Sequence, residues 1–342
     1  MADSNKSAAG ERAGAGFVFA ADLGGTHLRA ATVDQSGRIH FRLKHNTPRA
    51  ETADEIVRAL VLAVRECEKQ NTESAGDVGN TITAVSVVVP GTVNVEEGIV
   101  VKAPNVPSLD GFRLTAALAD ELTLPAILEN DANAAAVGEM WQGAGRGRRS
   151  IVCVTLGTGV GGGIILDGKL WRGVDGAAAE IGHMCVDPFG GVACGCGSRG
   201  CLEVYASATA IVRMAREASP RHPDSLLSIS ADLTSEAIYA AGLEADELAL
   251  EVFRRMGVYL GIGLANLINI INPEMIVIGG GVVNGWALFE KYMHQQVAER
   301  VFPLLAARVK IVRAECGDDA GLLGAARLAF TNSTDSSHVP VE

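Results

Sequence analysis

A pattern that occurs twice constrains the fold of this chain more than any other feature of its sequence. Each copy consists of an apolar strand, a loop rich in glycine and threonine, and a second apolar strand; the copies span residues 17–33 and 150–166. The loops lie at 22–26 and 157–163. Two such units in one chain indicate two lobes built on related strand–loop–strand motifs, and two unrelated hairpins are the alternative.

Strands and helices alternate along the rest of the chain, which predicts an α/β architecture. Thr52 and Glu55 have the spacing of a capping box for a helix over 53–69, and Asp131 opens a strong helix former that should continue to Trp141. Further strands are predicted at 39–43, 82–89, 126–129 and 275–278, with mostly helix between 205 and 274. A chain of 342 residues with 48% hydrophobic residues has enough apolar surface for two packed lobes.

Charge and cysteine content argue against several classes of protein. The net charge of −11 makes the chain a poor candidate for non-specific nucleic-acid binding. There is no uninterrupted apolar stretch of about 18 residues, so we expect no membrane span. Residues 1–16 are polar and rich in alanine and glycine, which predicts a disordered leader rather than a secretory signal. With 7 cysteines and no signal, we expect a cytoplasmic protein whose thiols are free or bind metal.

The strongest single signal of a site is the pattern His183, Cys194-x-Cys196-x4-Cys201. Three thiolates and one imidazole are the ligands that Zn²⁺ takes in a closed tetrahedral structural site. The glycine-rich residues between the cysteines allow a short loop to fold around one ion. Cys185 lies close to His183 in sequence and is an alternative ligand, although a buried thiol is the favoured interpretation. The remaining cysteines are predicted to be core thiols: Cys67, Cys153 and Cys316.

Both repeated loops offer backbone N–H groups and a hydroxyl, and their glycines leave room for a phosphate to approach. Neither loop has the Gly-Lys-Ser/Thr ending of a Walker A motif. Gly157-x-Gly159-x-x-Gly162 fits a dinucleotide pattern, but a strand rather than a crossover helix follows it, so we discount a nicotinamide-dinucleotide site. Asp22, at the end of a buried strand, either holds Mg²⁺ through water or caps its own turn.

Carboxylate and amide side chains gather at three points of the sequence. Asn130 and Asp131 follow a strand, Glu180 and His183 precede the cysteine loop, and Glu203 follows it. Hexose recognition uses such groups because they pair with several hydroxyls at once. We therefore expect these side chains to converge on a sugar, with Asp131 ionised near neutral pH at its helix start. A simple N-cap is the alternative role of this aspartate.

Taken in order, these motifs resemble the ROK family (repressors, open reading frames and kinases) over residues 17–330. The matching segments are Asp22-Leu-Gly-Gly-Thr26 with Arg29, Glu129-Asn-Asp131, Leu156-Gly-Thr-Gly159, Glu180-Ile-Gly-His183, Cys194-Gly-Cys-Gly-x-x-Gly-Cys201 with Glu203, and Ile278-Gly-Gly-Gly281. The resemblance implies an α/β, actin-like ATPase (ribonuclease H-like) fold, with two lobes around a central cleft. It assigns 17–128 and about 316–330 to a small α/β lobe, 129–315 to a large α/β lobe with the zinc loop, and 331–342 to a disordered tail.

The resemblance also implies roles for individual residues. Asp131 is the catalytic base, which deprotonates a sugar hydroxyl, usually the 6-OH, as it attacks the γ-phosphate of ATP. The implied sugar contacts are Asn105, Asn130, Asp131, Glu180, His183 and Glu203. The implied nucleotide contacts are Gly24, Gly25, Thr26, Thr158, Gly159, Gly279, Gly280 and Gly281. Asp22 would organise Mg²⁺, and a structural zinc on His183, Cys194, Cys196 and Cys201 would aim Glu203 into the cleft. Family members commonly form homodimers.

D-glucose, converted to glucose 6-phosphate, is the leading predicted substrate. Other hexoses are alternatives, namely N-acetylmannosamine, N-acetylglucosamine, fructose and allose, because the predicted contacts bind hydroxyls common to these sugars. Polyphosphate is an alternative phosphoryl donor. A sugar-responsive repressor of the same family needs a helix-turn-helix module, for which about 16 residues before Phe17 are too few. A sensor without catalysis is a further alternative, against which the presence of Asp131 argues.

One segment departs from the pattern of the family. Many members carry Gly-Gly-Glu or Ala-Gly-Glu before the Ile-Gly-His motif, whereas this chain has Ala178-Ala179-Glu180. The additional methyl group lies beside a predicted sugar contact. We expect kinase chemistry to be retained and the shape of the sugar pocket to be affected.

Overall fold

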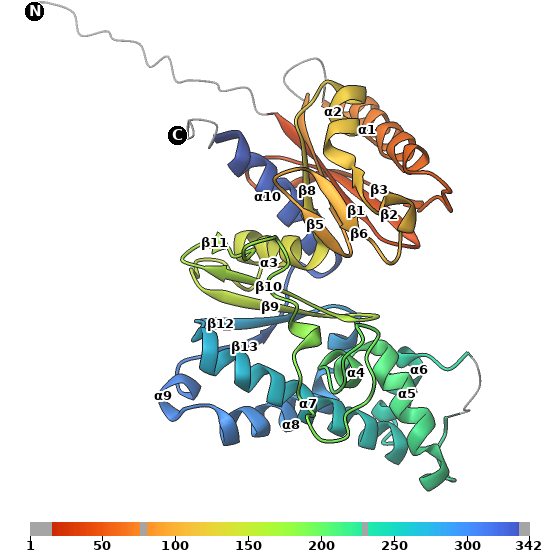
Figure 1. Cartoon of the computed structure of the whole chain (residues 1–342), viewed down its shortest axis with the longest axis vertical. Coiled ribbons are helices and arrows are strands. Elements are labelled where there is room, and N and C mark those ends of the chain that lie inside the picture. Colours follow the sequence, from red (N-terminus) through yellow and green to blue (C-terminus); the bar gives the residue numbers. More distant parts are fainter. Residues whose placement is uncertain (1–15, 76–80, 228–231, 335–342) are drawn as a thin grey trace, which may run out of the picture.

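The computed structural model describes residues 16–75, 81–227 and 232–334, which form two α/β lobes along the long axis of the molecule (Figure 1). Residues 1–15 and 335–342 belong to the predicted leader and tail and lie outside the described residues. Among the helices within the described ranges, none combines the length and apolar character needed to cross a membrane.

Five strands form the first sheet, in the order β3 (Ile39–Asn46), β2 (His27–Val33), β1 (Phe17–Leu23), β4 (Ile82–Val89) and β8 (Ala126–Asn130). β1, β2 and β3 pair antiparallel as consecutive hairpins, whereas β4 and β8 extend the sheet in parallel with β1. β1 and β4 are buried on both faces, which explains their unbroken apolar sequences.

Five strands form the second sheet, in the order β11 (Lys169–Leu170), β10 (Val160–Leu166), β9 (Ile151–Leu156), β12 (Met275–Gly279) and β13 (Lys310–Arg313). Its plan repeats that of the first sheet, with antiparallel hairpins followed by two parallel strands. The predicted pair of related strand–loop–strand units is therefore confirmed.

β10 begins earlier than the sequence predicts. The strand was expected at Ile164, but Val160 already pairs with Leu156. Gly161, Gly162 and Gly163 were interpreted as loop, yet their backbone groups complete the ladder with β9. A β-ladder forms through backbone N–H and C=O groups, so a run of glycines can form a strand when a neighbouring strand offers partners. The high glycine content of this segment therefore did not indicate a loop.

A third, small sheet was not predicted. It consists of β5 (Thr92–Asn94), β6 (Ile99–Lys102) and β7 (Phe112–Arg113) in antiparallel order. These strands are too short to show a clear alternation of apolar and polar residues. The short 3₁₀ helix η1 (Pro107–Leu109) follows β6, and Asn105 lies between them.

Helices cover both faces of the first sheet. α1 (Ala53–Ala75) and α2 (Leu114–Leu122) pack on one face, and α10 (Ala320–Thr334) packs on the other. α1 extends beyond the predicted end at residue 69. α10 ends at Thr334, so residues 331–334, which were predicted to belong to a disordered tail, are helical.

α3 (Asp131–Gln142) and α10 lie between the two sheets and connect the lobes (Figure 1). Their backbones are in direct contact, because a methyl group on Gly324 would overlap the carbonyl oxygen of Ala134. On its other side α3 packs against the second sheet, where Val137 shares a buried cluster with Ile151 and Ile165. The orientation of the lobes therefore depends on two helices held at very short range.

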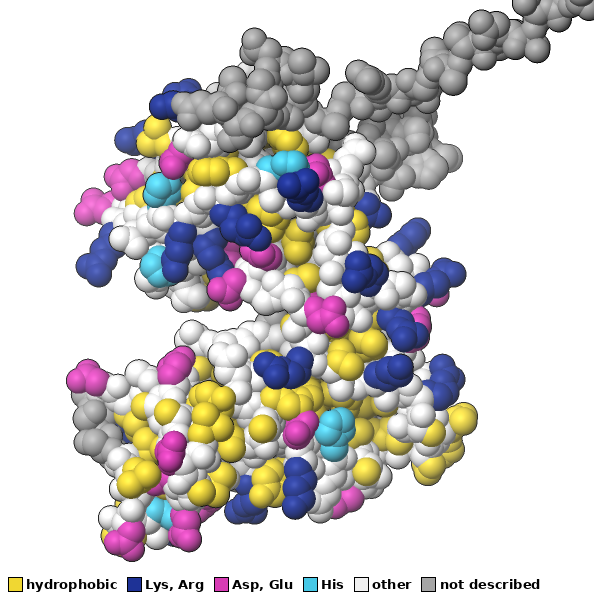
Figure 2. All heavy atoms as spheres, turned by 180° about the vertical axis from the view of Figure 1, so that it is seen from behind, with side chains coloured by type: hydrophobic (Ala, Val, Ile, Leu, Met, Phe, Trp, Pro, Cys, Tyr) yellow, Lys and Arg dark blue, Asp and Glu magenta, His cyan; other side chains and the backbone are white. Residues whose placement is uncertain are grey.

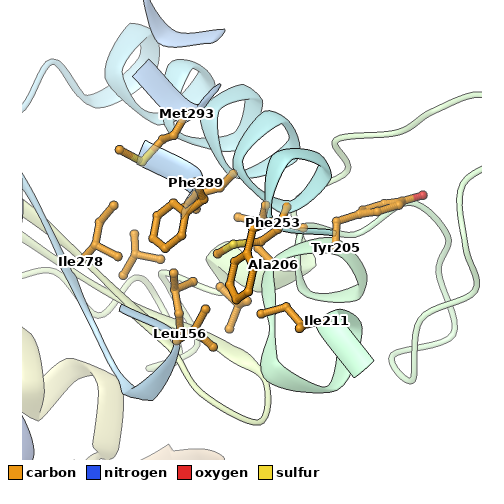
Figure 3. Packing of buried hydrophobic residues seen from close by; sticks show 14 of the residues in the cluster. Leu156, Tyr205, Ala206, Ile211, Phe253, Ile278, Phe289 and Met293 are labelled. Atoms are coloured by element: carbon orange, nitrogen blue, oxygen red, sulfur yellow. The ribbon is translucent and has the colours of Figure 1, made fainter. Parts of the chain in front are cut away.

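The outer face of the second sheet carries the largest core. Figure 3 shows Leu156 and Ile278 from the sheet in contact with the cluster around Phe253, Phe289 and Met293. The helices of this lobe are α4 (Glu203–Ala206), α5 (Ala208–Ala218), α6 (Ser235–Leu243), α7 (Glu247–Ile271), α8 (Trp286–Arg300) and α9 (Pro303–Ala306). The 3₁₀ helices are η2 (Ile181–His183), η3 (Ser219–Arg221), η4 (Gly281–Gly285) and η5 (Gly317–Asp319). This packing fixes the carboxyl ends of β9 and β12, which lead into the turns at Gly157 and Gly280.

Candidate active site between the lobes

A cleft of about 660 Å³ lies between the two lobes and is visible as the deep hollow between them in Figure 2. The first lobe contributes the end of β1, the turn after β4, the end of β6 and the start of α3. The second lobe contributes the loop between β9 and β10, residues 176–180, η2, α4 and the start of η4. Both repeated loops therefore reach the cleft, at the carboxyl ends of parallel strands where α/β folds bind their ligands.

The corner between β8 and α3 presents Asp131 to the cleft. Asn130, not Asp131, is the N-cap: its Oδ1 accepts hydrogen bonds from the backbone N–H of Ala132 (2.9 Å) and Asn133 (3.0 Å). The Asn130 amide also donates to the carbonyl of Gly91 (2.9 Å), which fixes this corner against the turn after β4. Because Asn130 caps the helix, the Asp131 carboxylate is available for the contents of the cleft.

The environment of Asp131 makes its carboxylate unusually basic. Burial raises its pKa most, the negative charges of Asp22 and Glu180 add to this shift, and a backbone hydrogen bond from Ala132 opposes it; together they bring the pKa to about 6. The expectation from the sequence considered only the helix start, which favours the ionised form. Asp131 is still mostly ionised at pH 7, and its pKa lies where a general base is effective.

Asp22 places a second carboxylate in the cleft, next to the guanidinium of Arg29. Its Oδ2 accepts a hydrogen bond from Nη2 of Arg29 (2.6 Å), and Nη1 of Arg29 lies 3.5 Å from Oδ2 of Asp318. Burial raises the pKa of Asp22, and Arg29 opposes this shift. Asp22, Arg29 and Asp318 all line the cleft, so the arrangement offers hard oxygen ligands near a positive charge.

The structure brings together every residue that was predicted to contact the sugar. Asn105, between β6 and η1, faces the cleft from the first lobe, while Glu180, His183 and Glu203 face it from the second. Oε2 of Glu203 accepts a hydrogen bond from the backbone N–H of Val160 (3.0 Å), at the start of β10. Glu203 is thus anchored to the glycine loop that precedes this strand.

The predicted zinc ligands form one compact cluster. One donor atom from each of His183, Cys194, Cys196 and Cys201 lies within 4.8 Å of the other three. The Sγ atoms of Cys196 and Cys201 are 3.7 Å apart, close to the ligand–ligand distance of about 3.8 Å expected for two Zn–S bonds of 2.3 Å in a tetrahedron. The donor set and its spacing therefore fit Zn²⁺. Cys185 is exposed and outside the cluster, so the expectation that its thiol is buried was wrong.

The predicted nucleotide contacts divide into two groups. Five of them line the cleft: Gly24, Thr158, Gly159, Gly280 and Gly281. Gly280 has φ +88°, and a methyl group there would overlap the backbone of Leu156, so only glycine fits this approach of η4 to β9. Gly25 and Thr26 are exposed at the tip of the first hairpin and outside the cleft lining, and Gly279 lines an adjoining cavity of about 170 Å³ with Asp22 and Asp131.

Comparison with known proteins identifies the family. A family model described as "ROK family" matches residues 18–332. The chain belongs to the ROK family. It is 38% identical over 307 residues to the glucokinase of Halalkalibacterium halodurans, which covers 89% of this chain and 92% of that protein. It is 35% identical over 315 residues to the glucokinase of Thermotoga maritima, with 91% and 96% covered.

A solved ROK structure agrees with the architecture. A ROK family glucokinase from Streptomyces griseus, in complex with glucose and AMPPNP, superposes with a TM-score of 0.76 at 36% identity. The match covers 92% of this chain and 99% of that one. The predictions of ROK membership and of a two-lobed, actin-like ATPase fold are confirmed.

Sequence reasoning assigned no role to several residues of this ROK site. Lys102, Asn133 and Asp318 line the cleft. Asp318 lies in η5, directly before α10 and far in sequence from the loops at 22–26 and 157–163, and only folding brings it to Arg29. The signal that could have found it is the pair Asp318-Asp319 directly before a helix, a pattern that by itself reads as capping.

Proposed function

We propose that this protein transfers the γ-phosphoryl group of ATP to the 6-hydroxyl of D-glucose. The observation that carries the proposal is the position of Asp131, a basic carboxylate in a cleft that also holds the predicted sugar contacts and the glycine loops. Support for the sugar and the donor comes from the two glucokinase relatives and from the S. griseus structure with glucose and AMPPNP. The enzyme is a sugar kinase of the ROK family.

Asp131 acts as the general base. It takes the proton of the glucose 6-hydroxyl while the oxygen of that hydroxyl forms a bond to the γ-phosphorus, and the bond from this phosphorus to the bridging oxygen breaks to release ADP. Positioning and charge stabilisation do most of the work in such a transfer. Asn105, Asn130, Glu180, His183 and Glu203 orient the hydroxyls from both lobes, so the sugar aligns with Asp131 only when both sides of the cleft hold it.

The nucleotide binds across the glycine loops of the two lobes. Gly24, Thr158 and Gly159 present backbone groups and a hydroxyl to the phosphates, and Gly280 and Gly281 lie beside the nucleoside. Mg²⁺, when bound, offsets the negative charge of the phosphates. Asp22 would hold it through water, since carboxylate oxygens and water are the ligands that Mg²⁺ prefers.

Zinc has a structural role in this proposal. His183, Cys194, Cys196 and Cys201 would hold the ion and keep the loop 194–201 next to η2. Glu203 follows this loop directly at the start of α4, so a bound metal would fix the position of its carboxylate. His183 belongs to both the metal cluster and the cleft lining, which couples sugar recognition to the metal site.

A turnover panel tests the proposal. The purified chain is assayed with ATP and five sugars (glucose, N-acetylglucosamine, N-acetylmannosamine, fructose and allose), and with polyphosphate in place of ATP. We expect the highest kcat/KM for glucose with ATP and formation of glucose 6-phosphate, with Asp131→Asn as the inactive control. A higher value for another sugar would reassign the substrate, and a chain that binds sugar without phosphoryl transfer would be a sensor.

Three further expectations remain predictions. These are a cytoplasmic location, assembly as a homodimer, and the lack of nucleic-acid and membrane partners. The acidic net charge of −11 supports the expectation about nucleic acid. Size-exclusion chromatography with light scattering tests the dimer directly, and a monomer at working concentration would contradict it.

A further inference from the structure

An ion pair between the buried Glu129 and the partly exposed Arg172 joins the two lobes directly behind Asp131. Glu129, near the end of β8, has a side chain that is only 1% exposed. Its Oε2 accepts a hydrogen bond from Nε of Arg172 (2.8 Å) and forms an ion pair with Nη2 of the same guanidinium (2.7 Å). Its Oε1 accepts from the backbone N–H of Asn130 (3.0 Å) and from Nδ2 of Asn133 (3.1 Å). These four nitrogens compensate a carboxylate that would otherwise be costly to bury.

Arg172 belongs to the other lobe, in the segment between β11 and η2. Its backbone carbonyl accepts a hydrogen bond from the N–H of Ala178 (3.0 Å), which closes this segment into a compact loop. Glu180 follows almost at once and faces the cleft. The ion pair therefore connects the element that begins with Asp131 to the loop that carries Glu180.

Charge explains why such a connection is needed. The negative charge of Glu180 is one of the causes that raise the pKa of Asp131, so the two carboxylates repel each other across the cleft. The ion pair between Glu129 and Arg172 lies behind the cleft, so its attraction opposes this repulsion without occupying space that a sugar needs. Neither Glu129 nor Arg172 is among the residues that line the cleft. A guanidinium suits this position because it holds two nitrogens, Nε and Nη2, in a fixed geometry against Oε2 of Glu129, which an ammonium group cannot do.

We propose that Arg172 and Glu129 are a positioning pair for the sugar site: they hold the loop 172–180 against the start of α3 and thereby determine the affinity for the hexose. The proposal rests on the proposed hexose-kinase function. It assigns no contact with substrate to either residue. Its consequence is that loosening the pair weakens sugar binding far more than it affects ATP binding or turnover.

The variant Arg172→Lys tests this consequence, because it keeps the charge and loses the two-nitrogen geometry. We expect KM and Kd for glucose to rise about tenfold, the effect of losing one charge-assisted hydrogen bond, while kcat and the KM for ATP stay within about twofold. The matched control is Arg308→Lys, at an exposed position outside the cleft lining, which should change none of these values. An unchanged glucose KM in Arg172→Lys, or an equal rise in the KM for ATP, would overturn the proposal.

A double variant separates positioning from general stability. Glu129→Gln with Arg172→Gln removes both charges, so no lone charge is left buried, and its Tm should be closer to wild type than that of either single variant. Because glutamine is shorter than arginine, the connection stays broken, and the glucose KM should stay raised. A glucose KM that recovers together with Tm would show a merely structural role and overturn the proposal.

Hydrogen exchange of the unliganded protein gives a readout that needs no activity. The amides of 173–180, which include the Ala178 N–H bonded to Arg172, should exchange faster in Arg172→Lys than in wild type. If wild type fails to phosphorylate glucose, the proposed function is refuted. Faster exchange in Arg172→Lys would still support the connection between the loop 172–180 and the start of α3. Unchanged exchange in this loop would overturn the connection whatever the enzyme phosphorylates.

Discussion

The Nδ1 atom of His183 lies 3.6 Å from the Sγ atom of Cys194. Bonds of about 2.0 Å to nitrogen and 2.3 Å to sulfur in a tetrahedral zinc site place these two ligands about 3.5 Å apart. The opposite ring nitrogen, Nε2, lies 3.9 Å from Oε2 of Glu180, a residue of the cleft. One imidazole thus faces the proposed metal site with one nitrogen and the proposed sugar site with the other, so loss of metal should be detected as loss of sugar affinity.

Removal of one zinc ligand tests this coupling. Cys196→Ala should lose the stoichiometric zinc and raise the glucose KM roughly tenfold or more, with a smaller effect on the KM for ATP. The reason is that His183 and Glu203 lose the orientation that the metal site gives them. Metal analysis and steady-state kinetics give both values. Cys185→Ala is the control: its thiol is exposed and outside the cluster, so zinc content and KM should stay at wild-type values. Wild-type protein purified without zinc would contradict the metal assignment itself.

Replacement of the proposed base should separate activity from stability. Asp131→Asn should lower kcat by about 10²- to 10⁴-fold, the usual contribution of a positioned base. The same change should stabilise the fold at pH 7. The pKa of Asp131 is raised to about 6 in the folded state, so ionising this group above that pH costs folding free energy, on the order of 1–3 kcal/mol. Denaturant unfolding at pH 7 and at pH 4 measures the free energy of unfolding of both proteins. Asp131→Asn should be more stable than wild type at pH 7, and this difference should be absent at pH 4. Near-normal turnover would refute the role of Asp131.

The pH dependence of wild type follows from the same group. Asp131 must be deprotonated to accept the proton of the sugar hydroxyl, so kcat/KM for glucose should fall as the pH decreases through about 6. ATP phosphates titrate in the same range, so a carboxyl ¹³C titration, with Asp131→Asn as the reference, assigns the midpoint to this residue. A midpoint near the ordinary aspartate value of about 4 would show that burial and the charge of Asp22 act less on this carboxylate than the structure indicates.

Local signals predicted the strands and helices well where they are long. The apolar strands that begin at Phe17 and Ile82 and the helix after Asn130 follow from periodicity and capping, which are properties of neighbouring residues. The errors arose where pairing across the chain decides the structure. The glycines before Ile164 form strand because β9 offers them partners, and β5 to β7 are too short for their own pattern to be detected.

The site could be predicted as a set of residues but not as a geometry. The cysteine loop was found because three cysteines and a histidine have few other uses at that spacing, whereas the roles of Asp131 and Glu180 came from the resemblance to the ROK family. Arg172 and Asp318 could not be found, since each matters through a partner far away in the sequence. The pKa of Asp131 was equally out of reach, because its burial and the approach of Asp22 depend on the packing of segments far apart in the sequence.

Ala179 holds a backbone conformation that favours glycine. Its φ is +65°, directly before Glu180, and it lines the cleft. Ala179→Gly should stabilise the protein by about 0.5–1 kcal/mol by relieving this conformation, whereas Ala178→Gly, whose φ is not positive, should destabilise it. Loss of the methyl group should also enlarge the sugar pocket and raise the kcat/KM for N-acetylglucosamine relative to glucose, by roughly tenfold. Equal shifts in Tm for both variants would show that the left-handed backbone stores no strain.

Two glycines of α10 should respond in opposite directions to the same substitution. A methyl group at Gly321 would meet its nearest neighbour, Oδ2 of Asp22, at 3.8 Å, an ordinary contact, so Gly321→Ala should stabilise the helix by about 0.5–1 kcal/mol. A methyl group at Gly324 would overlap the carbonyl oxygen of Ala134, so Gly324→Ala should destabilise the protein by about 1–3 kcal/mol despite the better helix propensity of alanine. Because α3 begins with Asp131, the forced separation of α3 and α10 should also lower kcat/KM. Denaturant unfolding of both variants, with kinetics on the folded fraction, gives the comparison. A neutral or stabilising Gly324→Ala would mean that the lobes are not held together by this backbone contact.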